Sequence, residues 1–165
     1  MKEYHILPAE QENWCVPVTL QALLKSRNFV MSQRHIEEYF PKISEEQWFK
    51  FNNDALNKFL KEFRLKSKFQ NPHENMEIYE EHIYLLREDF ERGDVIFAYD
   101  LADFQKRKNG PEGHVSLVRE FDSPSRLITL ADVILNNKSF PLRDFVVNMV
   151  SWKNPNYGVY VVSEK

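Results

Sequence analysis

The sequence contains one cysteine, four glycines and no long apolar run. A single cysteine excludes an intrachain disulfide and a zinc site built from several cysteines. Four dispersed glycines are too few for a loop that cradles phosphate groups. No segment approaches the ~20 apolar residues that a membrane-spanning helix needs, so we expect no insertion into a bilayer.

An excess of charge of either sign is also lacking. Lys and Arg number 22 and Asp and Glu number 25, which gives a formal net charge of -3. Nucleic-acid-binding proteins usually carry a strongly basic surface, and no nucleic-acid partner is expected here. Residues 1–8 contain no apolar stretch typical of a signal peptide, and we expect a cytoplasmic protein.

The composition that remains is typical of a globular enzyme-sized domain. Of the 165 residues, 42% are hydrophobic and 14% aromatic, which is enough to bury a self-supporting core. We therefore expect one domain over residues 1–165. His5, His35 and His73 show no spacing typical of metal ligands, so neither a metal nor an organic cofactor is expected.

The periodicity of apolar residues changes from helical to extended near the middle of the chain. It predicts helices at about 15–27, 32–40, 56–63, 77–92 and 142–149, and strands at 94–99, 114–121, 127–131 and 157–163. Ser32 is predicted to cap one helix, Ser44 and Gln47 form a capping box, and Gly93 is predicted as a left-handed helix stop. Helices followed by antiparallel strands indicate an α+β fold.

The lone cysteine stands where a helix is predicted to begin. Pro17 fits only the first turn of that helix, which puts Cys15 at its N-terminal end. The unpaired N–H groups and the helix dipole at that end favour a thiolate over a thiol.

A histidine and a carboxylate are predicted to meet at one end of a hairpin. His114 opens the first strand and Asp132 follows the second, so antiparallel pairing brings them to the same end. Such a histidine can act as general base toward Cys15, and the carboxylate can fix its tautomer. Gln11, four residues before Cys15, is placed to donate to an oxyanion.

These motifs together resemble those of a known family. A glutamine, Trp-Cys-x-Pro at a helix start, Gly-His at a strand start and Asp after the next strand resemble the papain-like cysteine peptidases, especially the bacteriocin-processing peptidases of double-glycine leaders and their stand-alone relatives. The resemblance implies a papain-like α+β fold, a triad of Cys15, His114 and Asp132, an oxyanion role for Gln11, a peptide or protein substrate and no cofactor. It spans most of the chain from residue 11 and is weakest at about 42–91.

Two departures from the family pattern leave alternatives open. Val16 stands where the family usually has glycine, and the family's glutamine usually stands a residue or two further from the cysteine, which makes Asn13 a second oxyanion candidate. The hypothesis is a cysteine peptidase or amidohydrolase; an acyltransferase and a catalytically silent binding module are the alternatives. The basic segment 105–110 is interpreted as a solvated loop, with a lid or a contact for acidic substrate as the other readings.

Overall fold

The computed structural model describes residues 1–42, 50–107 and 112–165. The elements in chain order are α1 (Cys15–Ser26), α2 (Gln33–Glu37), α3 (Asn53–Leu60), the 3-10 helix η1 (Lys61–Phe63), β1 (Leu65–Gln70), α4 (Met76–Leu85), α5 (Arg87–Arg92), β2 (Asp94–Asp100), α6 (Leu101–Phe104), β3 (Gly113–Asp122), β4 (Leu127–Ala131), β5 (Ser139–Pro141), α7 (Leu142–Ser151) and β6 (Gly158–Glu164).

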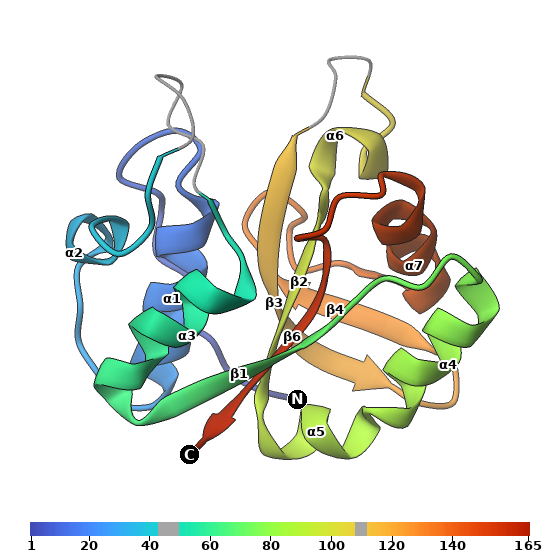
Figure 1. Ribbon diagram of the computed structural model, residues 1–165, viewed down its shortest axis with the longest axis horizontal. Coiled ribbons are helices and arrows are strands. Elements are labelled where there is room, and N and C mark those ends of the chain that lie inside the picture. The colour runs from blue at the N-terminus through green and yellow to red at the C-terminus, as the bar shows by residue number, and fades with distance from the viewer. Residues whose placement is uncertain (43–49, 108–111) are drawn as a thin grey trace.

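One six-stranded sheet, in the order β1-β6-β2-β3-β4-β5, organises the molecule. Each neighbouring pair of strands is antiparallel. Helices α1, α2 and α3 lie on one side of the sheet and α4, α5 and α7 on the other (Figure 1). The predicted α+β class is therefore confirmed.

The sheet separates two hydrophobic cores. Strand β2 shows this directly, because Ile96 and Ala98 pack in the core beneath α1, whereas Val95, Phe97 and Tyr99 pack in the core beneath α7. All seven residues of β2 are buried, as expected of a central strand covered on both faces. Full burial of each large apolar side chain contributes about 1.5–3 kcal/mol, so this strand is a rigid support for what lies at its ends.

Helix α1 is fixed to the sheet by packing and by one hydrogen bond. Leu20, Leu23 and Leu24 are fully buried against the sheet, at the helical spacing seen in the sequence. The Thr19 hydroxyl donates to the carbonyl oxygen of Val115 on β3 at 3.1 Å. The start of α1 is thereby held beside the start of β3.

Several local predictions are confirmed. Pro17 lies in the first turn of α1, and the Ser32 hydroxyl accepts the His35 N–H at 3.2 Å to cap α2. Strands β2, β3, β4 and β6 and helix α7 overlap their predicted ranges. The capping box at Ser44 and Gln47 lies outside the described residues.

Other local predictions were wrong. The helix predicted at 77–92 is two helices, α4 and α5, that meet at Leu86, and the helix predicted at 32–40 ends at Glu37. Gly93 is extended (φ -123°, ψ 166°), not left-handed. A side chain there would bring its Cβ within 2.7 Å of the Val162 carbonyl oxygen, so glycine allows β6 to approach.

Three short elements had no counterpart among the predictions. Strands β1 and β5 form the two edges of the sheet, and α6 lies in the predicted polar loop after β2. Edge strands face solvent and carry polar residues such as Lys66 and Lys68, which weakens the apolar signal. None of the helices described is long and apolar enough to cross a membrane.

Candidate active site

Cys15 is the first residue of α1 and is half-buried. The N-cap residue, Trp14, provides no capping side chain, so the first-turn N–H groups of the helix keep their free hydrogens. Asn13 adopts a left-handed conformation (φ 62°), which asparagine tolerates better than most residues. This turn directs the chain into the helix and sets the position of the thiol.

His114 is the second residue of β3, and its side chain is only 7% exposed. Its Nε2 lies 2.7 Å from Oδ2 of Asp132, which follows β4 directly. The hairpin formed by β3 and β4 thus brings the two residues together, as the sequence predicts.

The carboxylate of Asp132 is held by the turn that follows β4. Its Oδ1 accepts the N–H groups of Ile134 at 2.8 Å and of Leu135 at 3.0 Å. The Asp132 N–H in turn donates to Oδ1 of Asn137 at 3.1 Å. The backbone of the turn therefore fixes both the main chain and the side chain of this residue.

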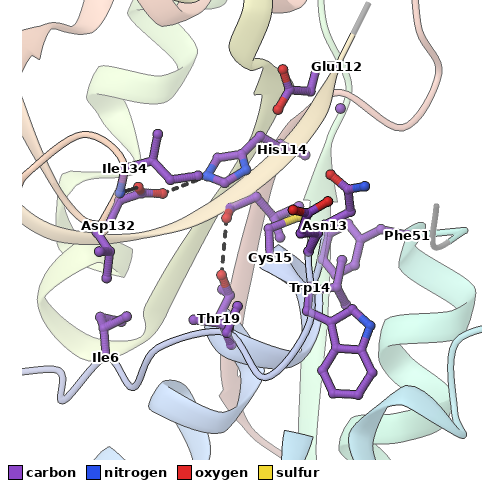
Figure 2. Close-up of a pocket in the computed structure, with 18 of the residues that line it drawn as sticks. Ile6, Asn13, Trp14, Cys15, Thr19, Phe51, Glu112, His114, Asp132 and Ile134 are labelled. Atoms are coloured by element: carbon purple, nitrogen blue, oxygen red, sulfur yellow. Dashed lines mark hydrogen bonds and ion pairs between the residues drawn. The ribbon is translucent and has the colours of Figure 1, made fainter. Parts of the chain in front are cut away.

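The imidazole of His114 lies between Asp132 and Cys15 (Figure 2). Burial acts to lower the pKa of His114, but the hydrogen bond to Asp132 and the nearby Cys15 outweigh burial and raise the pKa above its ordinary value. Burial acts to raise the pKa of Asp132, and the hydrogen bond and charge of His114 reverse this and lower it. Both shifts favour the charged forms, an imidazolium on His114 and a carboxylate on Asp132.

These residues open onto a pocket of about 760 Å³. Its wall combines the N-terminal segment, the start of α1, the start of β3 and the turn after β4, and it includes all four sequence-predicted residues: Gln11, Cys15, His114 and Asp132. Gln11 is exposed at this wall, and Asn13 borders the same space. The structure thus brings the predicted residues into one pocket and leaves both amides available there.

Val16 is 3% exposed and packs in the core between α1 and the sheet, while also bordering the pocket.

In the basic segment after α6, Arg107 pairs with Glu112, which also lines the pocket. Residues 108–110 of the segment 105–110, which is interpreted as a solvated loop, lie outside the described residues. Across the described ranges, no group of three or more His, Cys, Asp or Glu residues is arranged to hold a metal ion.

Sequence reasoning missed two further residues at the site. The Ser116 hydroxyl donates to Oδ2 of Asp132, and the Tyr99 ring packs edge-on against His114 with 5.6 Å between ring centroids. The available signal was the strand period, because Ser116 is a polar residue two positions after His114 and therefore on the same face.

Comparisons with known proteins place the fold. No family model matches the chain, and no curated protein matches it either. Among solved structures, the chain is similar to a double-glycine-motif protease from an AMS/PCAT transporter in complex with its leader peptide, with a TM-score of 0.63 and 10% identity over 99% of this chain and 93% of that one.

Two other solved structures are similar to the same extent. The peptidase domain of Streptococcus ComA, a bifunctional ABC transporter, gives a TM-score of 0.62 and 11% identity over 99% of this chain and 100% of that one. A C39-like peptidase from Bacillus anthracis gives a TM-score of 0.60 and 12% identity over 99% of each chain. The chain therefore has the papain-like fold of the double-glycine peptidase domains, as its motifs predict.

Proposed function

We propose that this protein is a cysteine peptidase or amidohydrolase that cleaves its substrate through an acyl-enzyme. The observation that carries the proposal is the imidazole of His114, hydrogen-bonded to Asp132 and lying beside Cys15 at the wall of one pocket. The shared fold with peptidase domains supports it.

Acylation begins after the proton of the Cys15 thiol has been transferred to His114, which leaves a thiolate. Since Nε2 of His114 is bonded to Asp132, Nδ1 is the nitrogen left for that proton. The thiolate attacks the carbonyl carbon, and a C–S bond forms as the carbonyl π electrons move to oxygen. Collapse of the tetrahedral intermediate breaks the C–N bond, and the imidazolium protonates the departing amine.

Deacylation reverses these roles. His114 takes a proton from water, and the hydroxide attacks the thioester carbonyl. The C–S bond then breaks, the carboxylic acid product leaves, and the thiolate beside the imidazolium is restored. Asp132 stays ionised throughout and holds the imidazole in place.

The oxyanion needs donors on the other side of the reacting carbon. The first-turn N–H groups of α1 supply one source, because no side chain caps them. We assign the second donor to the Gln11 side chain, which lies at the same wall of the pocket. Asn13 is the competing candidate because it is two residues nearer to Cys15.

A peptide or protein substrate fits the shape and chemistry of the pocket. Apolar residues from separate segments, Ile6, Val133 and Ile134 among them, border it beside Cys15. The similar transporter protease was solved in complex with the leader peptide, which supports a peptide as the ligand class.

The test is covalent trapping followed by product analysis. Incubation with a mixed-sequence peptide library should give a mass increase on the wild-type protein that maps to Cys15 and is absent from Cys15→Ala. Released carboxylic acid termini identify a hydrolase. Amides formed with added glycinamide instead of acids would identify an acyltransferase, and no adduct and no product would identify a silent binding module.

A further inference from the structure

We propose that Ser116 and Tyr99 are positioning residues that hold the Asp132 carboxylate against His114 through a directed chain of hydrogen bonds. The proposal rests on the proposed function for its catalytic consequence. Its structural part, the hydrogen bonding that holds the Asp132 carboxylate, can be tested without measuring turnover.

The directions of these hydrogen bonds follow from the chemistry of a carboxylate, which accepts and does not donate. Asp132 is ionised, so His114 Nε2–H and the Ser116 hydroxyl must both donate to its Oδ2. The only hydrogen of the Ser116 hydroxyl is then used. The Tyr99 hydroxyl, 3.0 Å from Ser116 Oγ, must therefore be the donor between those two oxygens.

Asp132 consequently accepts from four donors. His114 and Ser116 occupy Oδ2, and the N–H groups of Ile134 and Leu135 occupy Oδ1. A carboxylate with about four acceptor sites is saturated by this set, so rotating it would break several charge-assisted bonds together. The carboxylate thus fixes the proton of His114 on Nε2 and leaves Nδ1 for Cys15.

Tyr99 supports both ends of this arrangement. The register of β2 and β3 places it opposite His114, and its ring also packs edge-on against Phe145 at 5.4 Å. Burial raises the pKa of Tyr99 well above its ordinary value, with the charge of Asp132 adding to the effect, so the phenol keeps its hydrogen. One side chain therefore contacts the imidazole with its ring and orients Ser116 with its hydroxyl.

The cost of burial makes the arrangement informative. Ser116 and Tyr99 are both fully buried in the middle of the sheet. An unpaired hydroxyl there would cost about 1–3 kcal/mol, and the paired hydroxyls here satisfy each other and the carboxylate. The chain of bonds is complete only if all three side chains are present.

The test follows the titration of the Asp132 carboxyl by carbon NMR in the folded protein without substrate. Ser116→Ala removes one charge-assisted donor and should raise the pKa of Asp132 by about one unit. Tyr99→Phe should raise it less, and Ser116→Thr, which keeps the hydroxyl, should restore it. Ser67→Ala is the matched control, because Ser67 on β1 also donates to a side chain, Asn53, at 2.6 Å but lies outside the pocket.

Activity is the second readout. If the peptidase proposal holds, Ser116→Ala should lower kcat about tenfold with KM within twofold, as expected when geometry and not substrate binding is lost. An unchanged Asp132 titration in folded Ser116→Ala would overturn the positioning role, whatever happens to kcat. A shifted titration in a protein that hydrolyses nothing would retain the positioning role and refute the proposed function.

Ser116→Ala also leaves Tyr99 without its acceptor and threatens folding. In that event Tyr99→Phe decides the matter, since it removes one oxygen and leaves Ser116 free to donate. A rise in the pKa of Asp132 in Tyr99→Phe supports the chain of bonds, and no change overturns it.

Discussion

The candidate site has two halves that are built differently. The half on the sheet, with His114, Asp132 and Ser116, is buried and every one of these side chains is hydrogen-bonded. In the half that leads into α1, Gln11 and Asn13 are exposed, and among the described residues neither side chain makes a hydrogen bond within the chain. The proposed base, His114, is thus held in place by the protein itself, whereas the two amides that we propose as oxyanion donors are left without such bonds.

The freer half is nevertheless anchored from behind. The Asp94 carboxylate accepts from Tyr4 and from Arg27, each at 2.6 Å, at one end of the N-terminal segment. At the other end, buried Gln33 accepts the Glu10 N–H at 3.0 Å and donates to the Pro8 carbonyl oxygen at 2.9 Å. The backbone that forms this wall of the pocket is held, while its side chains are not.

The largest effect on turnover should come from substitution of Cys15, the proposed nucleophile, which both halves of the site adjoin. Cys15→Ala should abolish turnover, and Cys15→Ala with His114→Ala should be no worse, because nucleophile and base act as one unit. Product formation is the measurement, and residual activity within tenfold of wild type would remove Cys15 from the mechanism. Since the chain has one cysteine, iodoacetamide labelling reports on Cys15 alone, and it should slow in His114→Ala when the imidazolium is lost.

The next effect concerns the sheet half. Asp132→Asn should lower kcat by roughly 10–100-fold with little change in KM, because it removes the charge that orients His114. Asp122→Asn is the control, since Asp122 is exposed at the end of β3 and its side chain bonds only Ser125 among the residues described. Equal kcat for Asp132→Asn and wild type would reduce Asp132 to a turn residue.

The same substitution has a signature in stability against pH. The folded pKa of His114 is raised, so its contribution to stability is complete below the unfolded value of about 6.5 and is lost as pH rises through the folded value. The folded pKa of Asp132 is lowered, so its contribution is present above the unfolded value of about 3.9 and is lost as pH falls through the folded value. In Asp132→Asn the melting temperature should therefore change less with pH than in the wild type, both at the acidic and at the alkaline end of the range.

A smaller effect should separate the two amides in the freer half. Gln11→Ala should lower kcat about tenfold if its amide donates to the oxyanion, less than a fully enclosed donor would because Gln11 is exposed. Asn13→Gly removes the other amide and keeps the left-handed backbone (φ 62°) that alanine would strain. The variant with the larger loss of kcat identifies the donor, and equal, negligible losses would leave the oxyanion to the helix N–H groups.

The sequence was sufficient for the parts of the site that local rules control. Pro17 can occupy only the first turn, which placed Cys15, and a hairpin of known polarity placed His114 near Asp132. Cross-strand contacts were out of reach, because pairing Ser116 with Tyr99 and Asp132 requires the register of three strands.

The fold shows the same limit. The apolar run of the buried strand β2 predicts a strand. Edge strand β1 (Leu65–Gln70) carries two lysines and a serine, and its sequence resembles that of a loop. The prediction that Gly93 is a left-handed helix stop was wrong for the same reason. Glycine is required there by the Val162 carbonyl oxygen, which is distant in sequence, and not by the backbone angle of Gly93 itself.

The smallest effect expected is at the anchor of the freer half. Gln33 is 1% exposed and bridges the Pro8 carbonyl oxygen, the Glu10 N–H and Gln21 Oε1, which lies 3.1 Å from its amide nitrogen. Gln33→Leu keeps the volume and removes these bonds, which should cost about 1–3 kcal/mol of unfolding free energy. Because the sheet half is untouched, kcat should fall only about threefold, and the Glu10 amide should exchange its hydrogen faster.

Hydrogen exchange separates this local loosening from general destabilisation. Exchange should quicken at the backbone around Glu10 in Gln33→Leu and stay unchanged in the β3 strand that carries His114. Asn57→Leu is the matched control, because Asn57 makes a similar set of amide-to-backbone bonds to Ser67, at 2.7 and 3.1 Å, away from the pocket. If both variants lower kcat equally, the anchor has no specific effect on the site, and the two halves respond to stability alone.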